Sequence, residues 1–138
     1  MLSRNCFGIG RLRSSMSKER IDVGGNTYGP YSPGVKSNGL IWLSGQIDVE
    51  AGNDTASQTA GALAKIDALL EAAGVTKDAV CFAQVLLDDI GDFQEMNEVY
   101  GAWVDSMEVK PARAAFEAAA LPAGAKVEIV VQAIDTNH

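Results

Sequence analysis

The sequence predicts one α+β domain, in which a single mixed β-sheet carries two helices on one face. A chain of 138 residues with 47% hydrophobic and 21% charged residues suits one folded domain and is too short for two ordinary ones. Two segments with apolar residues at helical spacing alternate with short apolar runs of strand length. The last third holds two strand patterns in succession, which gives the order β, α, β, α, β, β, with room for an extra strand in front.

The first half of the domain contains a loop, a strand and a helix. Residues 23–39 are rich in Gly, Pro, Asn and Ser, which predicts a loop with a short extended piece near its end. Residues 40–43 form an apolar run typical of a buried strand. We expect the helix to begin with a capping box of Thr55 and Gln58 and to stop at Gly74. Its apolar positions are Leu63, Ile66, Leu69, Leu70 and Ala73.

The second half supplies a strand, a helix and two further strands. Residues 80–87 are an apolar run of strand length, and Asp92 with Glu95 predicts a second capping box at the start of a helix that Pro111 terminates at the latest. The remaining strands are expected at residues 113–119 and 125–133. With both helices on one face, the opposite face of the sheet has no cover from this chain, and self-association would bury it.

Composition argues against several classes of protein. No run of 18 apolar residues is present, so a membrane-spanning helix is not expected. The only histidine is the last residue, His138, and the two cysteines, Cys6 and Cys81, are too few for a Cys-rich zinc site or a disulfide scaffold. We expect Cys81, in an apolar strand, to be a buried small hydrophobe. The net charge of −7 argues against a nucleic-acid partner.

Residues 1–15 differ in composition from the rest of the chain. They carry Arg4, Arg11 and Arg13 and no acid, which is typical of an organelle transit peptide, most simply a mitochondrial one. The alternative is an extension upstream of a start at Met16, in which case the protein would be cytoplasmic. Either way the folded domain is residues 16–138, which hold 8 basic and 18 acidic side chains.

Two charged residues are candidates for catalysis. Arg113 is the only arginine after Arg20 and follows Pro111 at the start of a predicted strand. A guanidinium binds a carboxylate through two parallel hydrogen bonds, although spacing alone favours a surface arginine paired with one of the 18 acids. Glu128 lies within an apolar strand, where a carboxylate could accept a proton from water; the alternative is an ordinary residue of the polar face.

Three polar residues are weaker candidates. Tyr31 ends a rigid Gly-Pro turn that could present a phenol, and Ser44 follows a strand end where a hydroxyl and a free backbone amide would be available. Asn97 occupies a helix position otherwise suited to core contact, which predicts a hydrogen bond to the backbone. Each of these residues could equally be structural.

The ordered set of short motifs resembles the RidA/YjgF reactive-intermediate deaminase family over residues 27–134. The loop between Gln46 and Gln58 is shorter than in the commonest members, which indicates a shorter-looped subgroup. The motifs that carry the resemblance are Gly-Pro-Tyr-Ser at 29–32, Leu-Ser-Gly-Gln-Ile at 43–47, Gln-Thr at 58–59, Leu-Glu-Ala-Ala-Gly at 70–74, Asp-Phe at 92–93, Met-Asn-Glu-Val-Tyr at 96–100, Pro-Ala-Arg at 111–113, Leu-Pro at 121–122 and Val-Glu-Ile at 127–129.

The resemblance implies a fold, an assembly and a reaction. The fold would be similar to chorismate mutase of the trimeric α+β type, with three sheets packed into a central barrel and active sites between subunits. The reaction would be hydrolysis of 2-enamine or 2-imine acids, such as 2-aminoacrylate and 2-iminopropanoate, to 2-keto acids and ammonia, without metal or cofactor. Arg113 matches the arginine that holds the substrate carboxylate, and Glu128 matches the glutamate that orients or activates the water.

The resemblance also implies substrate-binding residues. Tyr31 matches a tyrosine that lines the cleft, and Ser44 and Asn97 match polar residues at or near the pocket. Backbone groups around Ala115 would contact the imine nitrogen. Alanine at 114 and 115 replaces the Ser and the Cys or Thr common in the family, which bears on the preferred substrate more than on the reaction class.

Two other functions are compatible with the same resemblance. The first is a non-catalytic trimer that binds small carboxylates and has a regulatory role. The second is the endoribonuclease or translation-inhibitor activity attributed to some relatives. The excess of acidic residues and the lack of a basic stripe count against the second.

Overall fold

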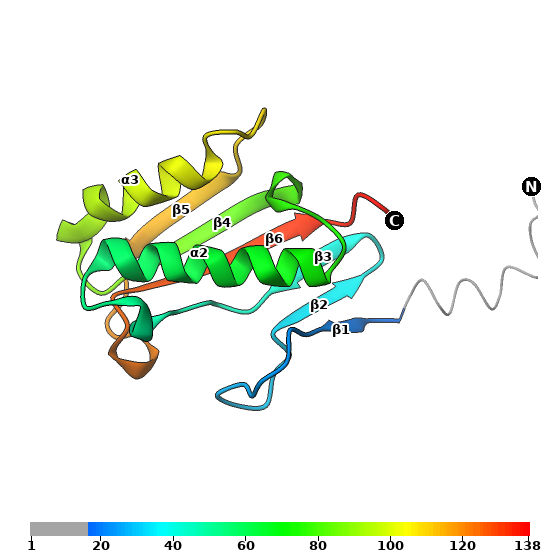
Figure 1. The fold of residues 1–138 in the computed structure, drawn as a ribbon, viewed down its shortest axis with the longest axis horizontal. Coiled ribbons are helices and arrows are strands. Elements are labelled where there is room, and N and C mark those ends of the chain that lie inside the picture. The colour runs from blue at the N-terminus through cyan, green and yellow to red at the C-terminus, as the bar shows by residue number, and fades with distance from the viewer. Residues whose placement is uncertain (1–16) are drawn as a thin grey trace, which may run out of the picture.

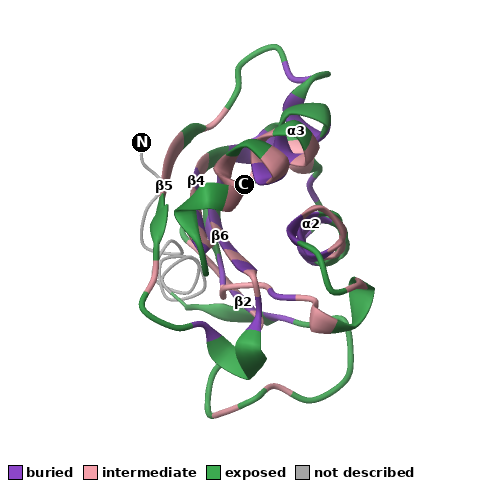
Figure 2. Ribbon diagram, turned by 90° about the vertical axis from the view of Figure 1, so that its left-hand side faces the viewer, coloured by how far each residue is buried: buried purple, intermediate pink, exposed green. Residues whose placement is uncertain are grey.

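A computed structural model describes residues 17–138, which form a six-stranded mixed sheet with both long helices on one face (Figures 1 and 2). The strand order is β1-β2-β3-β6-β4-β5, in which β4 and β5 are parallel and all other neighbours are antiparallel. The elements are β1 (Glu19–Ile21), β2 (Gly34–Ser37), β3 (Leu40–Leu43), α2 (Thr55–Ala72), β4 (Val80–Leu87), α3 (Phe93–Val104), β5 (Ala112–Glu117) and β6 (Val127–Ile134), with short 3-10 turns at Val49–Ala51, Lys77–Ala79, Ile90–Asp92 and Pro122–Gly124.

The predicted fold class and elements are confirmed. The sheet, the two helices on one face and the strand at residues 80–87 agree with the sequence patterns. Two strands precede β3 in the chain, β1 and β2, and they extend the sheet beyond β3. Cys81 is exposed, so the prediction that it is buried is wrong; a register shift between Val80 and Phe82 interrupts the strand alternation there. The predicted transit peptide lies outside the described residues. None of the helices in residues 17–138 combines the length and apolarity that a bilayer crossing requires.

The first helix, α2, begins after an N-cap aspartate and is followed by a glycine in the left-handed conformation. Asp54 is its N-cap, and the Asp54 carboxylate accepts a hydrogen bond of 2.9 Å from the Ser57 amide. The predicted capping box of Thr55 and Gln58 is therefore wrong by one position. Gly74 stops the helix as expected, since its φ of +88° is a conformation that glycine adopts without steric cost.

The acids at the start of α3 cap the other helix. Asp92 precedes α3 without a side-chain cap bond, which contradicts the capping box predicted for Asp92 and Glu95. The Asp92 carboxylate instead accepts a 2.8 Å bond from the Thr55 hydroxyl, and the Glu95 carboxylate accepts a 2.8 Å bond from the Ala56 amide. Both acids thus satisfy donors in the first turn of α2, where an anion is favoured by the helix dipole.

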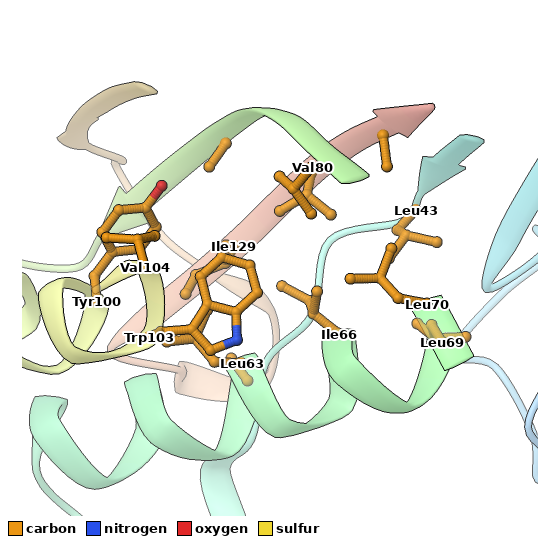
Figure 3. Close-up of a cluster of buried hydrophobic side chains, with 14 of the residues drawn as sticks. Leu43, Leu63, Ile66, Leu69, Leu70, Val80, Tyr100, Trp103, Val104 and Ile129 are labelled. Carbon is orange, nitrogen blue, oxygen red and sulfur yellow. The ribbon is translucent and has the colours of Figure 1, made fainter. Parts of the chain in front are cut away.

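The core lies between the helices and one face of the sheet (Figure 3). Trp103 of α3 also donates an indole hydrogen bond of 2.9 Å to Asp67 of α2, which fixes the two helices to one another. Strand alternation supplies the sheet side of the core, because Val127, Ile129 and Val131 are fully buried while their neighbours are not. The helix side is formed by Leu63, Ile66, Leu69, Leu70, Met96, Tyr100, Trp103 and Val104.

The opposite face of the sheet carries partly exposed apolar side chains. A small cluster of Ile47, Leu121 and Ala125 covers one end of this face, against Leu86. Elsewhere four large hydrophobic residues are between 40% and 46% exposed: Leu40, Trp42, Phe116 and Ile134. Such an apolar face is unusual for a surface in contact with water.

Candidate functional site

A pocket of about 650 Å³ opens between the loop before β2, the segment after β3 and residues 65–69 of α2. Three of the candidate residues line it, namely Tyr31, Ser44 and Glu128. Other lining residues include Tyr28, Gln46 and Lys65. We call this space the Glu128 pocket.

Hydrogen bonds fix the wall of the Glu128 pocket where Ser44 meets the loop before β2. The Ser44 hydroxyl donates to the carbonyl of Ser32 at 2.7 Å, and the Ser44 amide donates to the carbonyl of Pro33 at 2.9 Å. The Tyr31 phenol accepts a longer bond of 3.4 Å from the Tyr28 amide. Ser44 therefore holds the loop that presents Tyr31, and its oxygen can still accept a hydrogen bond from a ligand.

Glu128 is a carboxylate without a partner in residues 17–138. It lies on the sheet face opposite the helices, paired in register with Leu86, and its carboxyl group occupies the space above Gly45 that any larger residue would fill. No hydrogen bond or ion pair to the Glu128 carboxylate is present among these residues. Burial raises the pKa of Glu128, because it disfavours the charged form. A raised pKa makes the ionised carboxylate a better proton acceptor.

Lys65 lines the same pocket, but its ammonium group is engaged elsewhere. It donates to the carbonyl of Ile47 at 2.8 Å and lies 3.8 Å from the Asp48 carboxylate. Lys65 thus fixes the segment after β3 to α2. It does not neutralise Glu128, which is not among its ion-pair partners.

Arg113 forms a second cluster, outside the Glu128 pocket. It lies on β5, in register with the buried Ala83, and so projects on the helix side of the sheet. Its Nη1 donates to Oδ1 of Asn97 at 2.7 Å. Its guanidinium carbon lies 4.8 Å from the ring centre of Tyr100 and 5.5 Å from that of Phe93. We call these four residues the Arg113 cluster.

The partner of Arg113 differs from the acid that spacing alone favours. All 18 acids of the chain belong to residues 17–138, yet none lies within ion-pair distance of Arg113. The alternative of a surface arginine paired with an acid is therefore wrong. Asn97 bonds to this guanidinium, so its predicted hydrogen bond to the backbone is wrong as well. Ala115 follows on the same side of β5 and packs against the core.

The structure thus separates the six candidate residues into two groups. Tyr31, Ser44 and Glu128 share the pocket, whereas Asn97, Arg113 and Ala115 lie at the β5 edge of the sheet. Two strand spacings and three residues of rise place the backbones of Arg113 and Glu128 about 14 Å apart. Their side chains also leave opposite faces of the sheet, so a single chain does not bring both to one small molecule.

Two residues of the Arg113 cluster are not identified by sequence reasoning. Phe93 and Tyr100 lie in motifs that carry the family resemblance, but the sequence patterns do not predict their contact with Arg113. A signal was present, because positions 93, 97 and 100 share one helix face and place an amide between two rings. No group of three or more His, Cys, Asp or Glu side chains in residues 17–138 is arranged to hold a metal ion.

Comparison with known proteins places this chain in a family. The family model described as Endoribonuclease L-PSP matches residues 25–135. A RutC family protein of Saccharolobus solfataricus is 40% identical over 109 residues, 75% of this chain and 85% of that protein. The 2-iminobutanoate/2-iminopropanoate deaminase of Bos taurus is 39% identical over 112 residues, 77% of this chain and 80% of that protein.

Solved structures agree with the sequence comparison. A YjgF-family protein of Neisseria meningitidis has a TM-score of 0.79 and 39% identity, covering 90% of this chain and 99% of that one. This chain belongs to the RidA/YjgF family, which the Endoribonuclease L-PSP model describes. The bovine relative is named an imine deaminase and a relative from Arabidopsis thaliana is named Reactive Intermediate Deaminase A, whereas others carry only the family name RutC.

Proposed function

We propose that this protein hydrolyses 2-imino and 2-enamine acids to 2-keto acids and ammonia, as an assembly of identical subunits with sites between them. The observation that carries the proposal is the environment of Arg113: its guanidinium is bonded to Asn97, and no acid of residues 17–138 lies within ion-pair distance of it. The name of the bovine relative, a 2-iminobutanoate/2-iminopropanoate deaminase, supports the reaction class.

Arg113 would bind the substrate carboxylate. One of its five N–H donors is engaged by Asn97, which leaves donors for a bidentate pair with a carboxylate. Binding of the substrate carboxylate at the β5 edge of the sheet would orient the imine carbon relative to the attacking water molecule. Positioning is a large part of the catalysis required, since imines hydrolyse in water without help.

Glu128 would move the proton that the reaction requires. The enamine first takes a proton from solvent on carbon and becomes the iminium ion. Glu128 then accepts a proton from water as the water oxygen bonds to the iminium carbon, and the C=N π electrons move to nitrogen, which becomes a neutral amine. Glu128 returns its proton to that amine, the C–N bond breaks as ammonia leaves, and the hydroxyl group releases its proton to solvent as the C–O bond becomes a carbonyl. One water is consumed and Glu128 is regenerated.

A second copy of the chain would unite the two groups. Arg113 and Glu128 leave opposite faces of the sheet, while the open face carries apolar residues such as Trp42 and Phe116 that a second sheet would bury. A subunit placed there could bring its own Arg113 cluster to the Glu128 pocket of its neighbour. Three subunits is the number implied by the resemblance to the family, and a closed ring gives each subunit the same contacts.

A trapping competition tests the proposed reaction. A serine or threonine dehydratase generates the imine in the presence of semicarbazide, and adduct formation is followed with and without this protein. We expect the protein to lower adduct formation. We expect Arg113→Ala to weaken this effect by at least about tenfold, because a charge-assisted bidentate pair is lost. Glu128→Gln should weaken it about 100-fold by removing the proton acceptor.

Matched variants control for charge and folding. Lys110→Ala removes a positive charge three residues from Arg113, at an exposed position, and should leave the activity unchanged. An Arg113→Ala protein with full activity would refute the role of Arg113. If the wild-type protein binds 2-keto acids but changes no adduct level, the non-catalytic carboxylate-binding alternative replaces this proposal.

A further inference from the structure

The guanidinium of Arg113 lies against two aromatic rings from the same helix. Phe93, Asn97 and Tyr100 follow one another at i, i+4 and i+7 along α3, which places them on one face. The guanidinium carbon is 4.8 Å from the Tyr100 ring centre and 5.5 Å from the Phe93 ring centre, within the range of a cation–π contact. Asn97 adds one hydrogen bond of 2.7 Å between them.

These contacts hold the cation without cancelling its charge. An acid at any of the three positions would form an ion pair and compete with an incoming carboxylate. Aromatic rings and a neutral amide attract the guanidinium but carry no net charge, so its positive charge stays available. The planar guanidinium can therefore be oriented in the free subunit before a ligand arrives.

We propose that Tyr100 and Phe93 are positioning residues that orient Arg113 for a carboxylate ligand. The inference rests on the proposed function, because it supplies the reason why an arginine at this edge must be fixed and unpaired. Neither ring is required to touch the substrate. Their effect is on the affinity for carboxylates, through the orientation of one side chain.

The hydroxyl group of Tyr100 makes no hydrogen bond in residues 17–138, so the contact of Tyr100 with Arg113 is made by the ring. The Tyr100 ring is only 5% exposed, and its oxygen is the one buried side-chain N or O atom in residues 17–138 without a hydrogen-bond partner. Figure 3 shows that oxygen at the end of the ring directed away from α3. Burial raises the pKa of Tyr100, against an opposing effect of Arg113, so the phenol is neutral. Arg113 thus contacts the face of the Tyr100 ring, and we expect the Tyr100 oxygen to be dispensable for that contact.

The test compares Tyr100→Phe, which keeps the ring, with Tyr100→Leu, which removes it. The side-chain N–H signals of Arg113 are recorded by ¹⁵N NMR and identified by their loss in Arg113→Ala. Pyruvate binding is measured by calorimetry. We expect Tyr100→Phe to match the wild type in both. We expect the side-chain N–H signals of Arg113 to be averaged in Tyr100→Leu, because the guanidinium is no longer held in one orientation. Pyruvate binding should weaken by roughly tenfold, while a cooperative thermal transition shows that the variant is folded.

Either of two results would overturn the inference. One is a Tyr100→Leu protein with wild-type Arg113 signals and affinity, and the other is a Tyr100→Phe protein that loses them. Phe93→Leu provides a second variant if Tyr100→Leu does not fold, because Phe93 is only partly buried at the first position of the helix. If the wild-type protein binds no 2-keto acid, the proposed function fails, while the NMR comparison still decides whether the rings orient Arg113.

Discussion

Arg113 and Glu128 are kept in opposite electrostatic conditions, and each condition has a local cause. Among residues 17–138, Arg113 has aromatic and amide neighbours but no acid within ion-pair distance, so its charge is not neutralised there. Glu128 is partly buried above Gly45 and has no cationic partner among residues 17–138, so burial disfavours its charged form. A residue larger than glycine at position 45 would occupy the space of the Glu128 carboxyl group. The pair thus combines a permanent cation with a readily protonated carboxylate.

The raised pKa of Glu128 predicts a pH-dependent effect of Glu128→Gln on stability. The native state holds this proton more tightly than the unfolded state, so the stabilisation is present at acidic pH and is lost as the pH rises through the native pKa. Glutamine does not titrate. We expect the variant to gain stability relative to the wild type as the pH rises from 4 to 8, measured by urea unfolding at fixed protein concentration.

Glu98→Gln is the matched control for this titration, because Glu98 is exposed on α3. It should show no such trend between pH 4 and 8. If Glu128→Gln instead loses stability relative to the wild type as the pH rises, then the carboxylate has a cationic partner in the assembled protein, and its role as an uncompensated acid would be refuted.

The two helices depend on each other at their N-termini. Glu95, in the first turn of α3, accepts a hydrogen bond from the Ala56 amide in the first turn of α2. This amide has no partner inside its own helix, so the contact replaces a local cap. We expect Glu95→Ala to lower the free energy of unfolding by about 1 kcal/mol, as loss of a cap does. Urea denaturation at pH 7 measures the change.

Glu98→Ala is the comparison for Glu95→Ala, since it removes an exposed carboxylate one turn further along the same helix. It should change the stability by less than about 0.5 kcal/mol, as exposed substitutions usually do. Equal losses for the two variants would show that the contact with α2 contributes nothing measurable.

The same contacts show what local sequence patterns can and cannot predict. Periodicity placed both helices and the strands, because the core-facing positions repeat at 3.6 or 2 residues. The spacing of Asp92 and Glu95 correctly marked the start of α3, yet their oxygens bond to Thr55 and Ala56. A capping box is defined within one helix, whereas these partners lie more than 35 residues away in the chain. Such pairing follows from the packing of α3 beside α2.

Only part of the candidate site could be predicted from the sequence, because its contacts also join different elements. Arg113 was singled out as the last arginine of the chain, and Asn97 as a polar residue at an apolar helix position, but their hydrogen bond spans two elements. Tyr100 is buried in the core, and helical periodicity does not separate such packing from its contact with Arg113. The division of the residues between two faces required the strand register.

At the scale of the whole molecule, the open face and the divided site have one explanation. A single subunit leaves apolar residues in water on the face from which Glu128 projects, and it places Arg113 on the other side of the sheet. Assembly of identical subunits would bury the first and complete the second. Light scattering should give the mass of a trimer, and a stable monomer would contradict the shared site.

Subunit mixing tests the shared site most directly. Arg113→Ala and Glu128→Gln proteins, each with the reduced activity expected in the trapping assay, are unfolded together in equal amounts and refolded, and mass spectrometry confirms the mixed trimers. A site that takes Arg113 from one subunit and Glu128 from the next would be intact once in every mixed trimer, so roughly a quarter of the wild-type activity should return. Mixed trimers without activity would contradict the account, because sites within single subunits cannot be restored by mixing.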